Sequence, residues 1–356
     1  MTPLGAEIAA LIRHGGPIGV DRYMALCLGH PVHGYYRTRD PLGVQGDFTT
    51  APEISQMFGE LVGAWVAYVH GRMGRPDPLI LVELGPGRGT LMADALRALR
   101  VAAPGVRVSL HLVETSPVLR DVQARALAGT DPTWHAGLET LPEGPAIFIA
   151  NEFFDCLPVC QFERRPSGWH ERQVGLGPEG GLVFGLAPEP AVEIEAPGTE
   201  GALLSVPGAG LALMRTLARR LRATGGTLLA IDYGHVRPGF GDTLQALAGH
   251  RFADPLAAPG EADLTHHVDF AALARAARAE AATILGPVEQ REFLLALGLL
   301  ERAERLKARA TADQVLTIDS AVERLTDASL TGMGSLFKVL AVTDQDLGPL
   351  PGFPEA

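Results

Sequence analysis

Leu79-Ile80-Leu81-Val82-Glu83-Leu84-Gly85-Pro86-Gly87-Arg88-Gly89-Thr90 is the stretch that decides the fold of this 356-residue chain. Its first six residues form a nearly continuous apolar run, which is typical of a parallel strand buried on both faces. The glycine-rich turn is followed by Leu91, Leu96 and Leu99 at helical spacing. A strand, a glycine-rich loop and a helix in this order predict the first unit of a Rossmann-like α/β domain, whose ligands bind where the strands end.

The alternation of strands and helices continues beyond this stretch and extends the predicted sheet. Ser116-Pro117 supplies a capping serine and a first-turn proline for a second helix. Gly225-Gly226 ends a third helix, whose apolar stripe includes Met214 and Leu221. The strands expected after the first are Val106–Val113, Thr133–Ala136, Ala146–Ala150, Thr227–Ile231 and Phe337–Val342.

Outside the sheet the pattern changes in several places. Thr50-Ala51-Pro52-Glu53 has the form of a capping box ahead of an amphipathic helix. Two longer helices are expected at Phe270–Ala282 and Glu289–Ala310. Short apolar segments separated by glycine and proline indicate a β-meander in the region before the fifth strand. The predicted regions are a helical N-terminal region with a lid-like loop (1–50), the first part of the core (51–157), a β-rich insertion (158–205), and a second core part with a helical C-terminal substrate region (206–356).

Composition excludes several classes of protein. Apolar residues make up 47% and charged residues 20%, which is typical of a folded globular protein and not of a disordered chain. The net charge of −11 argues against nucleic acid as a partner. No apolar run reaches the roughly 18 residues that a membrane span requires. Residues 1–16 lack the features of a signal or transit peptide, so we expect a cytosolic protein with no membrane partner.

Neither the cysteines nor the histidines predict a metal centre. One pair of neighbouring histidines, His266 and His267, lies close to Asp269, but adjacent histidines cannot easily converge on one ion. We interpret the 263–270 segment as the entry into a helix and expect no metal. Three cysteines form no C-x-x-C pair and are interpreted as small buried hydrophobes: Cys27, Cys156 and Cys160.

The glycine-rich loop distinguishes between two kinds of cofactor. A dinucleotide-binding loop has the spacing G-x-G-x-x-G, and the helix that follows points its N-terminus at a pyrophosphate. Here the spacing is E-x-G-x-G-x-G, and Glu83, two residues before Gly85, would repel a pyrophosphate. S-adenosylmethionine carries an ammonium and a sulfonium and no phosphate, and glycines let the backbone approach it closely. The loop therefore favours S-adenosylmethionine over NAD.

A second acid supports this cofactor. Glu114 ends the second strand and suits a bidentate acceptor for the ribose hydroxyls. The alternative is that the glycines form only a tight turn and that Glu114 is a surface acid. The cofactor-binding residues that we predict are Glu83, Gly85, Pro86, Gly87, Gly89, Glu114, Thr115, Leu138 and Asn151.

Asn151-Glu152-Phe153-Phe154-Asp155 follows the fourth strand, at the edge of the sheet where ligands bind. Two carboxylates, an amide and two aromatic rings suit a flat, cationic substrate. The alternative is that the aromatic residues belong to the core and that Glu152 caps a turn. Asp232, Tyr233 and His235 end the fifth strand and border the same edge, where a packing or turn role is equally compatible with the pattern.

Further motifs accompany these stretches along the chain. The set comprises Gly46–Ser55, Glu83–Thr90, His111–Glu114, Asn151–Pro158, Ile231–His235, and Asp263–Thr265 with His267–Phe270. Together they resemble the MidA family of class I methyltransferases, and the match runs from about Met24 to Lys338. One departure is His266, where a small residue is expected. Mitochondrial members of that family methylate an arginine of a complex I subunit symmetrically and are needed to assemble the complex.

The resemblance implies a class I methyltransferase fold, S-adenosylmethionine as cofactor, and as substrate a protein with an exposed arginine, with a complex I subunit as the candidate. Arginine stays protonated, so carboxylates must localise its charge and accept a proton late in the reaction. We predict that Glu152 and Asp155 do this, with Asp47 as the third candidate. A small-molecule methyltransferase and a non-catalytic assembly factor are the alternatives, and the intact cofactor motif argues against the second.

Overall fold

The computed structural model describes residues 1–38, 50–344 and 347–354. The chain folds into two compact units. The predicted N-terminal region and β-rich insertion fall mainly into one of them, which also takes residues 237–269 that we expected in the core. The smaller unit comprises Met1–Phe48, Asp155–Ala212 and Arg237–Asp269, and the larger unit comprises Thr49–Phe154, Leu213–Val236 and Phe270–Ala356.

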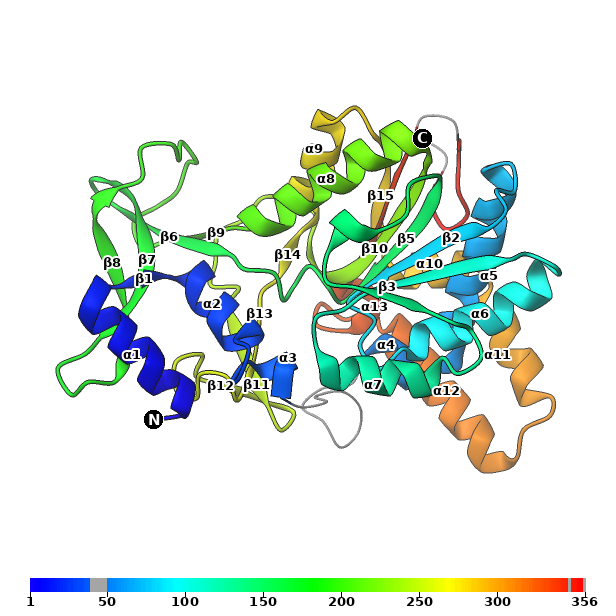
Figure 1. Cartoon of the computed structure of the whole chain (residues 1–356), viewed down its shortest axis with the longest axis horizontal. Coiled ribbons are helices and arrows are strands. Elements are labelled where there is room, and N and C mark those ends of the chain that lie inside the picture. Colours follow the sequence, from blue (N-terminus) through cyan, green and yellow to red (C-terminus); the bar gives the residue numbers. More distant parts are fainter. Residues whose placement is uncertain (39–49, 345–346, 355–356) are drawn as a thin grey trace. The chain divides into compact units, whose positions relative to one another are not determined.

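The larger unit is built on one sheet, with the strand order β15-β16-β10-β5-β2-β3-β4 (Figure 1). Strands β10, β5, β2, β3 and β4 run parallel, and β16 is antiparallel to both β10 and β15. This arrangement confirms the predicted Rossmann-like α/β core. The strands are β2 (Leu79–Leu84), β3 (Val108–Val113), β4 (Thr133–His135), β5 (Ala146–Asn151), β10 (Gly226–His235), β15 (Thr283–Glu289) and β16 (Phe337–Thr343).

The strand order reverses between β2 and β5. From β2 the chain proceeds outward through β3 and β4, and then returns to place β5 on the other side of β2. In open α/β sheets such a reversal leaves a crevice at the carboxyl ends of the two strands, and ligands bind there. The glycine-rich loop after β2 and the segment after β5 therefore flank the position where a ligand is expected.

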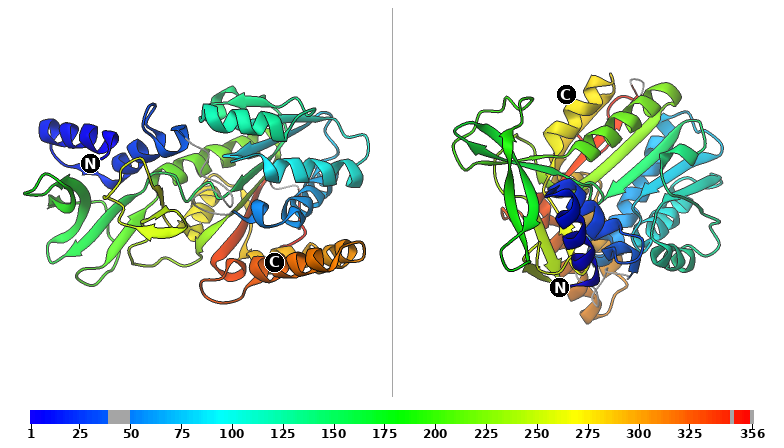
Figure 2. Two further views of the ribbon diagram at one scale, coloured as in Figure 1. Left: turned by 90° about the horizontal axis from the view of Figure 1, so that it is seen from below. Right: turned by 60° about the vertical axis from the view of Figure 1, so that its left-hand side comes forward.

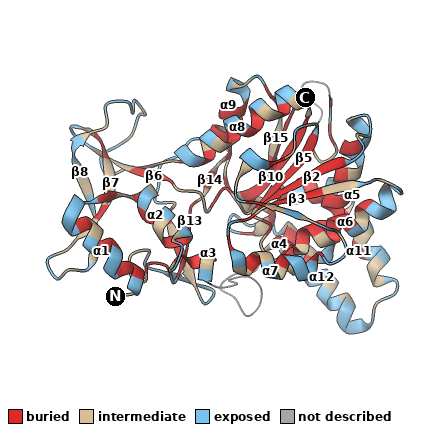
Figure 3. Cartoon of the chain, in the orientation of Figure 1, coloured by how far each residue is buried: buried red, intermediate tan, exposed pale blue. Residues whose placement is uncertain are grey.

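Helices cover the sheet, whose central strands β2, β5 and β10 are almost entirely buried (Figure 3). Alternate strand residues, such as Leu81, Ile147 and Leu229, share one apolar cluster with residues of α5, α6, α10, α11 and α12. Helices α8 and α9 lie side by side on the sheet (Figures 1 and 2). The helices are α4 (Ala51–Ile54), α5 (Gln56–Arg72), α6 (Thr90–Ala102), α7 (Pro117–Ala126), η1 (Leu138–Thr140), α8 (Gly208–Thr224), α9 (Phe270–Ala279), α10 (Gln290–Ala296), α11 (Leu299–Lys307), α12 (Ala312–Thr326) and α13 (Met333–Leu336).

The smaller unit combines short helices with two antiparallel sheets. Strands β6 to β9 confirm the β-rich insertion, and β1 extends their sheet by pairing with β7. Strands β11, β12 and β13 form a separate sheet that we did not predict. The elements are α1 (Pro3–Gly15), β1 (Ile18–Gly19), α2 (Val20–Gly29), α3 (Tyr35–Thr38), β6 (Cys160–Arg165), β7 (Gly168–Leu176), β8 (Leu182–Pro190), β9 (Leu203–Val206), β11 (Gln245–Ala248), β12 (Arg251–Ala253), β13 (Asp263–Thr265) and β14 (Val268–Asp269).

Two predicted helices are interrupted. The helix expected after the Thr50 capping box stops at Ser55, whose extended backbone separates α4 from α5 and whose hydroxyl accepts from the Met57 N–H. Thr50 makes no side-chain cap. The helix expected over Glu289–Ala310 is divided at Gly298, which has a φ of 90° and ends one helix while beginning the next. A left-handed glycine terminates a helix because its positive φ turns the residues that follow it out of the helical path.

A pair of histidines lies buried in the larger unit. His111 Nδ1 and His135 Nε2 are 2.9 Å apart, the other nitrogen of His111 lies 2.9 Å from Ser109 Oγ, and that of His135 lies 2.7 Å from Thr140 Oγ1. Burial lowers the pKa of both imidazoles, and the charges of neighbouring arginines lower it further. The folded protein therefore favours the neutral pair.

This pair predicts a loss of stability in weak acid. Because the pKa of each folded histidine lies below its unfolded value of about 6.5, the unfolded state binds more protons as the pH falls through that value. The thermal unfolding midpoint of the parent protein should therefore fall relative to that of His135→Gln as the pH is lowered from 7.5 to 5.5, because the other titrating groups contribute equally to both proteins. An equal change of midpoint in the two proteins would contradict the assignment.

Candidate functional site

The glycine-rich loop turns sharply out of the buried strand β2. Gly85, Gly87 and Gly89 have φ values of 60°, 55° and 81°, in the left-handed region that favours glycine. Gly89 is also the N-cap of α6. A Cβ atom at Gly85 would lie 2.7 Å from Cδ2 of Phe153, a residue of the segment after β5. Glycine at this position lets the two segments that flank the crevice approach each other.

Two buried acceptors at this place have no hydrogen-bond partner among the described residues. Glu83 is 2% exposed, and its Oε2 accepts no hydrogen bond from them; the same holds for Oδ1 of Asn151, which is 8% exposed. Burial raises the pKa of Glu83 to about 8. β2 and β5 are paired neighbours, with Leu84 opposite Ala150. Because buried acceptors without donors cost free energy, these atoms fit a ligand that brings its own cationic donor.

Glu114 lies beyond the end of β3 and is held in a fixed orientation. Its Oε1 accepts from the Ser116 N–H at 2.7 Å, and its Oε2 accepts from Gln123 Nε2 at 3.2 Å. Burial raises the pKa of this carboxyl, and the two hydrogen bonds offset part of the rise. Glu114 is 8% exposed and is therefore not a surface acid. An oriented carboxylate with remaining lone pairs is suited to accept from a pair of hydroxyl groups.

The other predicted cofactor residues lie around these groups. Pro86 is buried within the glycine-rich loop, and Thr115 is exposed directly after Glu114. Leu138 begins η1 and is half-buried. All three belong to the larger unit, together with the residues described above.

Glu152 occupies a strained turn after β5. Its φ is 49°, unusual for a residue with a side chain. Its Oε1 accepts from the Ala51 N–H, the first of α4, at 3.1 Å and from Asn151 Nδ2 at 3.3 Å. Phe154 is 2% exposed and belongs to the core, whereas Phe153 is only half-buried. The alternative that the aromatic residues belong to the core thus holds for Phe154 and not for Phe153. Glu152 does contribute to the start of α4.

Asp232 supports this turn from the neighbouring strand. Its side chain is fully buried, and Oδ2 accepts from the backbone N–H groups of Phe153 at 3.1 Å and Phe154 at 2.9 Å. Oδ1 accepts from the Tyr233 N–H. Of the two roles compatible with the sequence, a turn role is the one that these contacts indicate. A carboxylate that replaces the missing backbone partners stabilises an unusual turn.

The remaining catalytic candidates are placed differently. Asp155 belongs to the smaller unit, where it is 6% exposed and its carbonyl accepts from the His266 N–H at 2.9 Å. Asp47 lies outside the described residues.

The ring nitrogens of His266 lie 3.1 Å from the His267 carbonyl and 3.2 Å from the Leu157 carbonyl. The 263–270 segment leads into α9, as predicted.

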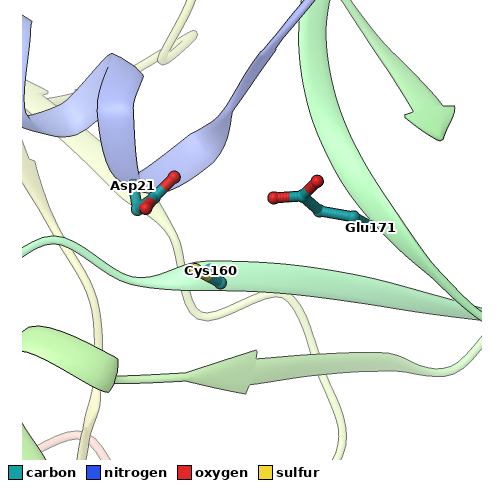
Figure 4. A group of neighbouring side chains, drawn as sticks. All are labelled: Asp21, Cys160 and Glu171. Carbon is teal, nitrogen blue, oxygen red and sulfur yellow. The ribbon is translucent and has the colours of Figure 1, made fainter. Parts of the chain in front are cut away.

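One group of metal-ligand type occurs among the described residues (Figure 4). The ligand atoms of Asp21, Cys160 and Glu171 lie within 4.8 Å of one another in the smaller unit. Burial, together with the two carboxylates, raises the pKa of the Cys160 thiol to about 12. Three ligand-type side chains, two of them partly exposed carboxylates, do not by themselves define a metal centre, and we assign the group no ion. Of the three cysteines, only Cys27 is fully buried, whereas the other two are partly exposed.

Comparison with known proteins identifies the class of protein that this site serves. A family model described as "Putative S-adenosyl-L-methionine-dependent methyltransferase" matches residues 61–288, which include the glycine-rich loop, Glu114 and Asn151. The chain belongs to this family, and the resemblance to MidA methyltransferases is confirmed. It is an S-adenosylmethionine-dependent methyltransferase with the fold predicted for one.

The names of individual relatives give more detail than the description of the family. The chain is 40% identical over 340 residues to the mouse protein named protein arginine methyltransferase NDUFAF7, mitochondrial, covering 87% of this chain and 77% of the relative. Identity to the human protein of that name is 37%, covering 88% and 78%. A crystal structure of a Burkholderia thailandensis protein bound to S-adenosyl-homocysteine matches with a TM-score of 0.84 at 28% identity, covering 98% of this chain and 93% of that one.

The comparison corrects one expectation. We expected a cytosolic protein, but the relatives from mouse, fly and human are named mitochondrial, so this expectation is wrong. The composition of the first 16 residues is too little evidence from which to predict the cellular compartment of a protein. Among the described residues, no helix has both the length and the apolar character needed to cross a bilayer.

Proposed function

We propose that this methyltransferase transfers a methyl group to an arginine side chain of a protein. The relatives named as protein arginine methyltransferases support this substrate class. The observation that carries the proposal is the Glu152 carboxylate, which is fixed at the carboxyl end of β5 beside the glycine-rich loop. By the resemblance to the MidA family, the protein substrate is a subunit of respiratory complex I.

The cofactor is held, in this proposal, by the residues that end β2, β3 and β5. Glu83 and Asn151 receive its ammonium group, because their buried oxygens have no donor within the described parts of the chain. Glu114 receives the ribose hydroxyls. The glycine-rich loop, with Gly85, Pro86, Gly87 and Gly89, admits the cofactor between β2 and β5, and Thr115 and Leu138 border the adenosine. When bound, S-adenosylmethionine would supply an electrophilic methyl group on a sulfonium, and the neutral thioether S-adenosylhomocysteine would leave as the carbon–sulfur bond breaks.

Glu152 acts on the guanidinium. The carboxylate localises the positive charge on the nitrogens that it contacts, so that the remaining nitrogen becomes nucleophilic. When that nitrogen has bonded to the methyl carbon it must lose one proton, and a neighbouring carboxylate accepts it. Asp155 and Asp47 are the other acids that we propose for this proton transfer. The hydrogen bonds from the Ala51 N–H and from Asn151 Nδ2 hold the Glu152 carboxylate in place before the substrate arrives.

The ionisation of Glu83 predicts a pH-dependent affinity. Since its pKa is about 8, Glu83 is largely protonated at pH 7, and a bound ammonium ionises it. The affinity for S-adenosylhomocysteine should therefore rise from pH 6.5 to pH 8, by up to about tenfold per unit, with release of a proton. Calorimetry in two buffers of different ionisation enthalpy measures both effects. Glu83→Gln should bind weakly and equally across this range; an unchanged pH dependence in this variant would contradict the assignment.

The proposed substrate class is tested by locating the transferred methyl group. Cell extract is incubated with the purified protein and a methyl-labelled donor, and labelled proteins are digested and sequenced by mass spectrometry. We expect the label on arginine, and no label when the protein is omitted. Label confined to small molecules would favour the alternative of a small-molecule methyltransferase, and no transfer to any acceptor would favour a non-catalytic binding protein.

A further inference from the structure

Helix α7 carries a polar residue at a position where its pattern requires an apolar one. The buried residues of this helix are Leu119 and Gln123, and Gln123 is fully buried, with 0% exposure. Burying an amide costs free energy unless its donors and its acceptor all find partners. A glutamine at such a position therefore needs a reason beyond packing.

The amide of Gln123 makes hydrogen bonds through both of its ends. Nε2 donates to the Gly87 carbonyl at 2.7 Å and to Glu114 Oε2 at 3.2 Å. Oε1 accepts from the indole N–H of Trp134 at 2.8 Å. One side chain on α7 thus connects the glycine-rich loop after β2, the acid at the end of β3, and the strand β4 beyond it.

These bonds determine how Glu114 presents its carboxylate. The Ser116 N–H binds one oxygen and Gln123 binds the other, so the plane of the group is fixed from both sides. Without the donation from Gln123, Oε2 would lose this restraint on rotation about the last bond of the side chain. The bond to Gly87 ties the same amide to the loop, which keeps the loop and the acid at a constant separation.

We infer that Gln123 is a positioning residue that confers ribose recognition on this site, by clamping Glu114 to the glycine-rich loop. The inference rests on the proposed role of Glu114 as the acceptor for the ribose hydroxyls. No ligand atom contacts Gln123 in this account. Its effect is exerted through Glu114, so its removal should change the selectivity for the ribose and not only the overall affinity.

The test compares two ligands, S-adenosylhomocysteine and its 2′-deoxy analogue, by calorimetry on the full chain. The parent protein should bind the first more tightly by on the order of ten- to a hundredfold, the effect of one hydrogen bond to a charged group. In Gln123→Met, which keeps the length of the side chain but has no donor, this ratio should fall toward one. Gln123→Leu also has no donor at this position, is apolar like the rest of the buried face, and should behave in the same way if Gln123→Met does not fold.

Trp134→Phe is the matched control. It removes only the bond onto Oε1 of the amide and leaves both donations by Gln123 possible, so the ligand ratio of the parent should be retained. A parental ratio in Gln123→Met or Gln123→Leu would overturn the inference, and so would loss of the ratio in Trp134→Phe, since packing of α7 would then be the cause. A parent protein that binds both ligands equally would instead refute the ribose role of Glu114.

Discussion

Replacing Glu152 by glutamine should lower the turnover for an arginine peptide on the order of a hundredfold or more, while the affinity for S-adenosylhomocysteine stays at the parental value. This is the scale seen when one preorganised electrostatic group is deleted from an active site. The variant keeps its shape, and the amide oxygen can still accept from the Ala51 N–H that Glu152 Oε1 binds at 3.1 Å. What it loses is the negative charge that draws positive charge away from the attacking nitrogen.

Steady-state kinetics with the peptide and calorimetry with the product separate these effects. Glu301→Gln, the same exchange at an exposed position near the start of α11, is the control and should leave both quantities unchanged. Parental turnover in Glu152→Gln would transfer the role to Asp155 or Asp47. Loss of cofactor binding instead would place Glu152 in the cofactor pocket or in the stability of the fold, to which its contact with α4 contributes.

Replacing Gly85 by valine should abolish binding of S-adenosylhomocysteine. Two effects add at this position: the φ of 60° disfavours a β-branched residue, and the new Cβ would lie 2.7 Å from the ring of Phe153. The loop and the segment after β5 must then move apart. The affinity should fall by on the order of a hundredfold or below detection in calorimetry, because the site depends on the position of both segments.

Gly74→Val separates the two effects. Gly74 has a similar φ of 78°, but no described atom lies within 4 Å of the position that a Cβ atom would take there, so valine imposes backbone strain without a clash at the site. This variant should unfold at a lower temperature and yet bind the ligand as the parent does. If it too failed to bind, general destabilisation and not the local clash would explain the result for Gly85→Val.

The core of the fold could be predicted because each of its units carries local signals. A continuous apolar strand such as Leu79–Leu84, the glycines after it and the serine cap of α7 at Ser116 all act within a few residues of one another. The helix break at Gly298 was missed because the apolar pattern continues across it. Strands β11 to β13 were missed because they are short, and because β13 joins the hairpin of β11 and β12 from further along the chain.

The candidate site, like the fold, could be predicted only where the signals are local. Glu83, Glu114 and Asn151 stand at strand ends, where a fold prediction alone brings them to one edge of the sheet. The role of Gln123 could not be predicted, since its three partners lie 9 to 36 positions away along the chain. A polar residue on the otherwise apolar face of α7 was the available signal. Asp232 likewise supports a turn 78 and 79 residues before it, which no local pattern indicates.

Calorimetric titration of the purified protein with S-adenosylhomocysteine and, separately, with NAD tests the central claim most directly. We propose that a cationic nucleoside without phosphate binds to the oxygens of Glu83 and Asn151, which accept no hydrogen bond from the described residues, and to the oriented carboxylate of Glu114. We therefore predict saturable binding of S-adenosylhomocysteine at one site per chain and no heat with NAD. Tight binding of NAD with no response to S-adenosylhomocysteine would contradict the account.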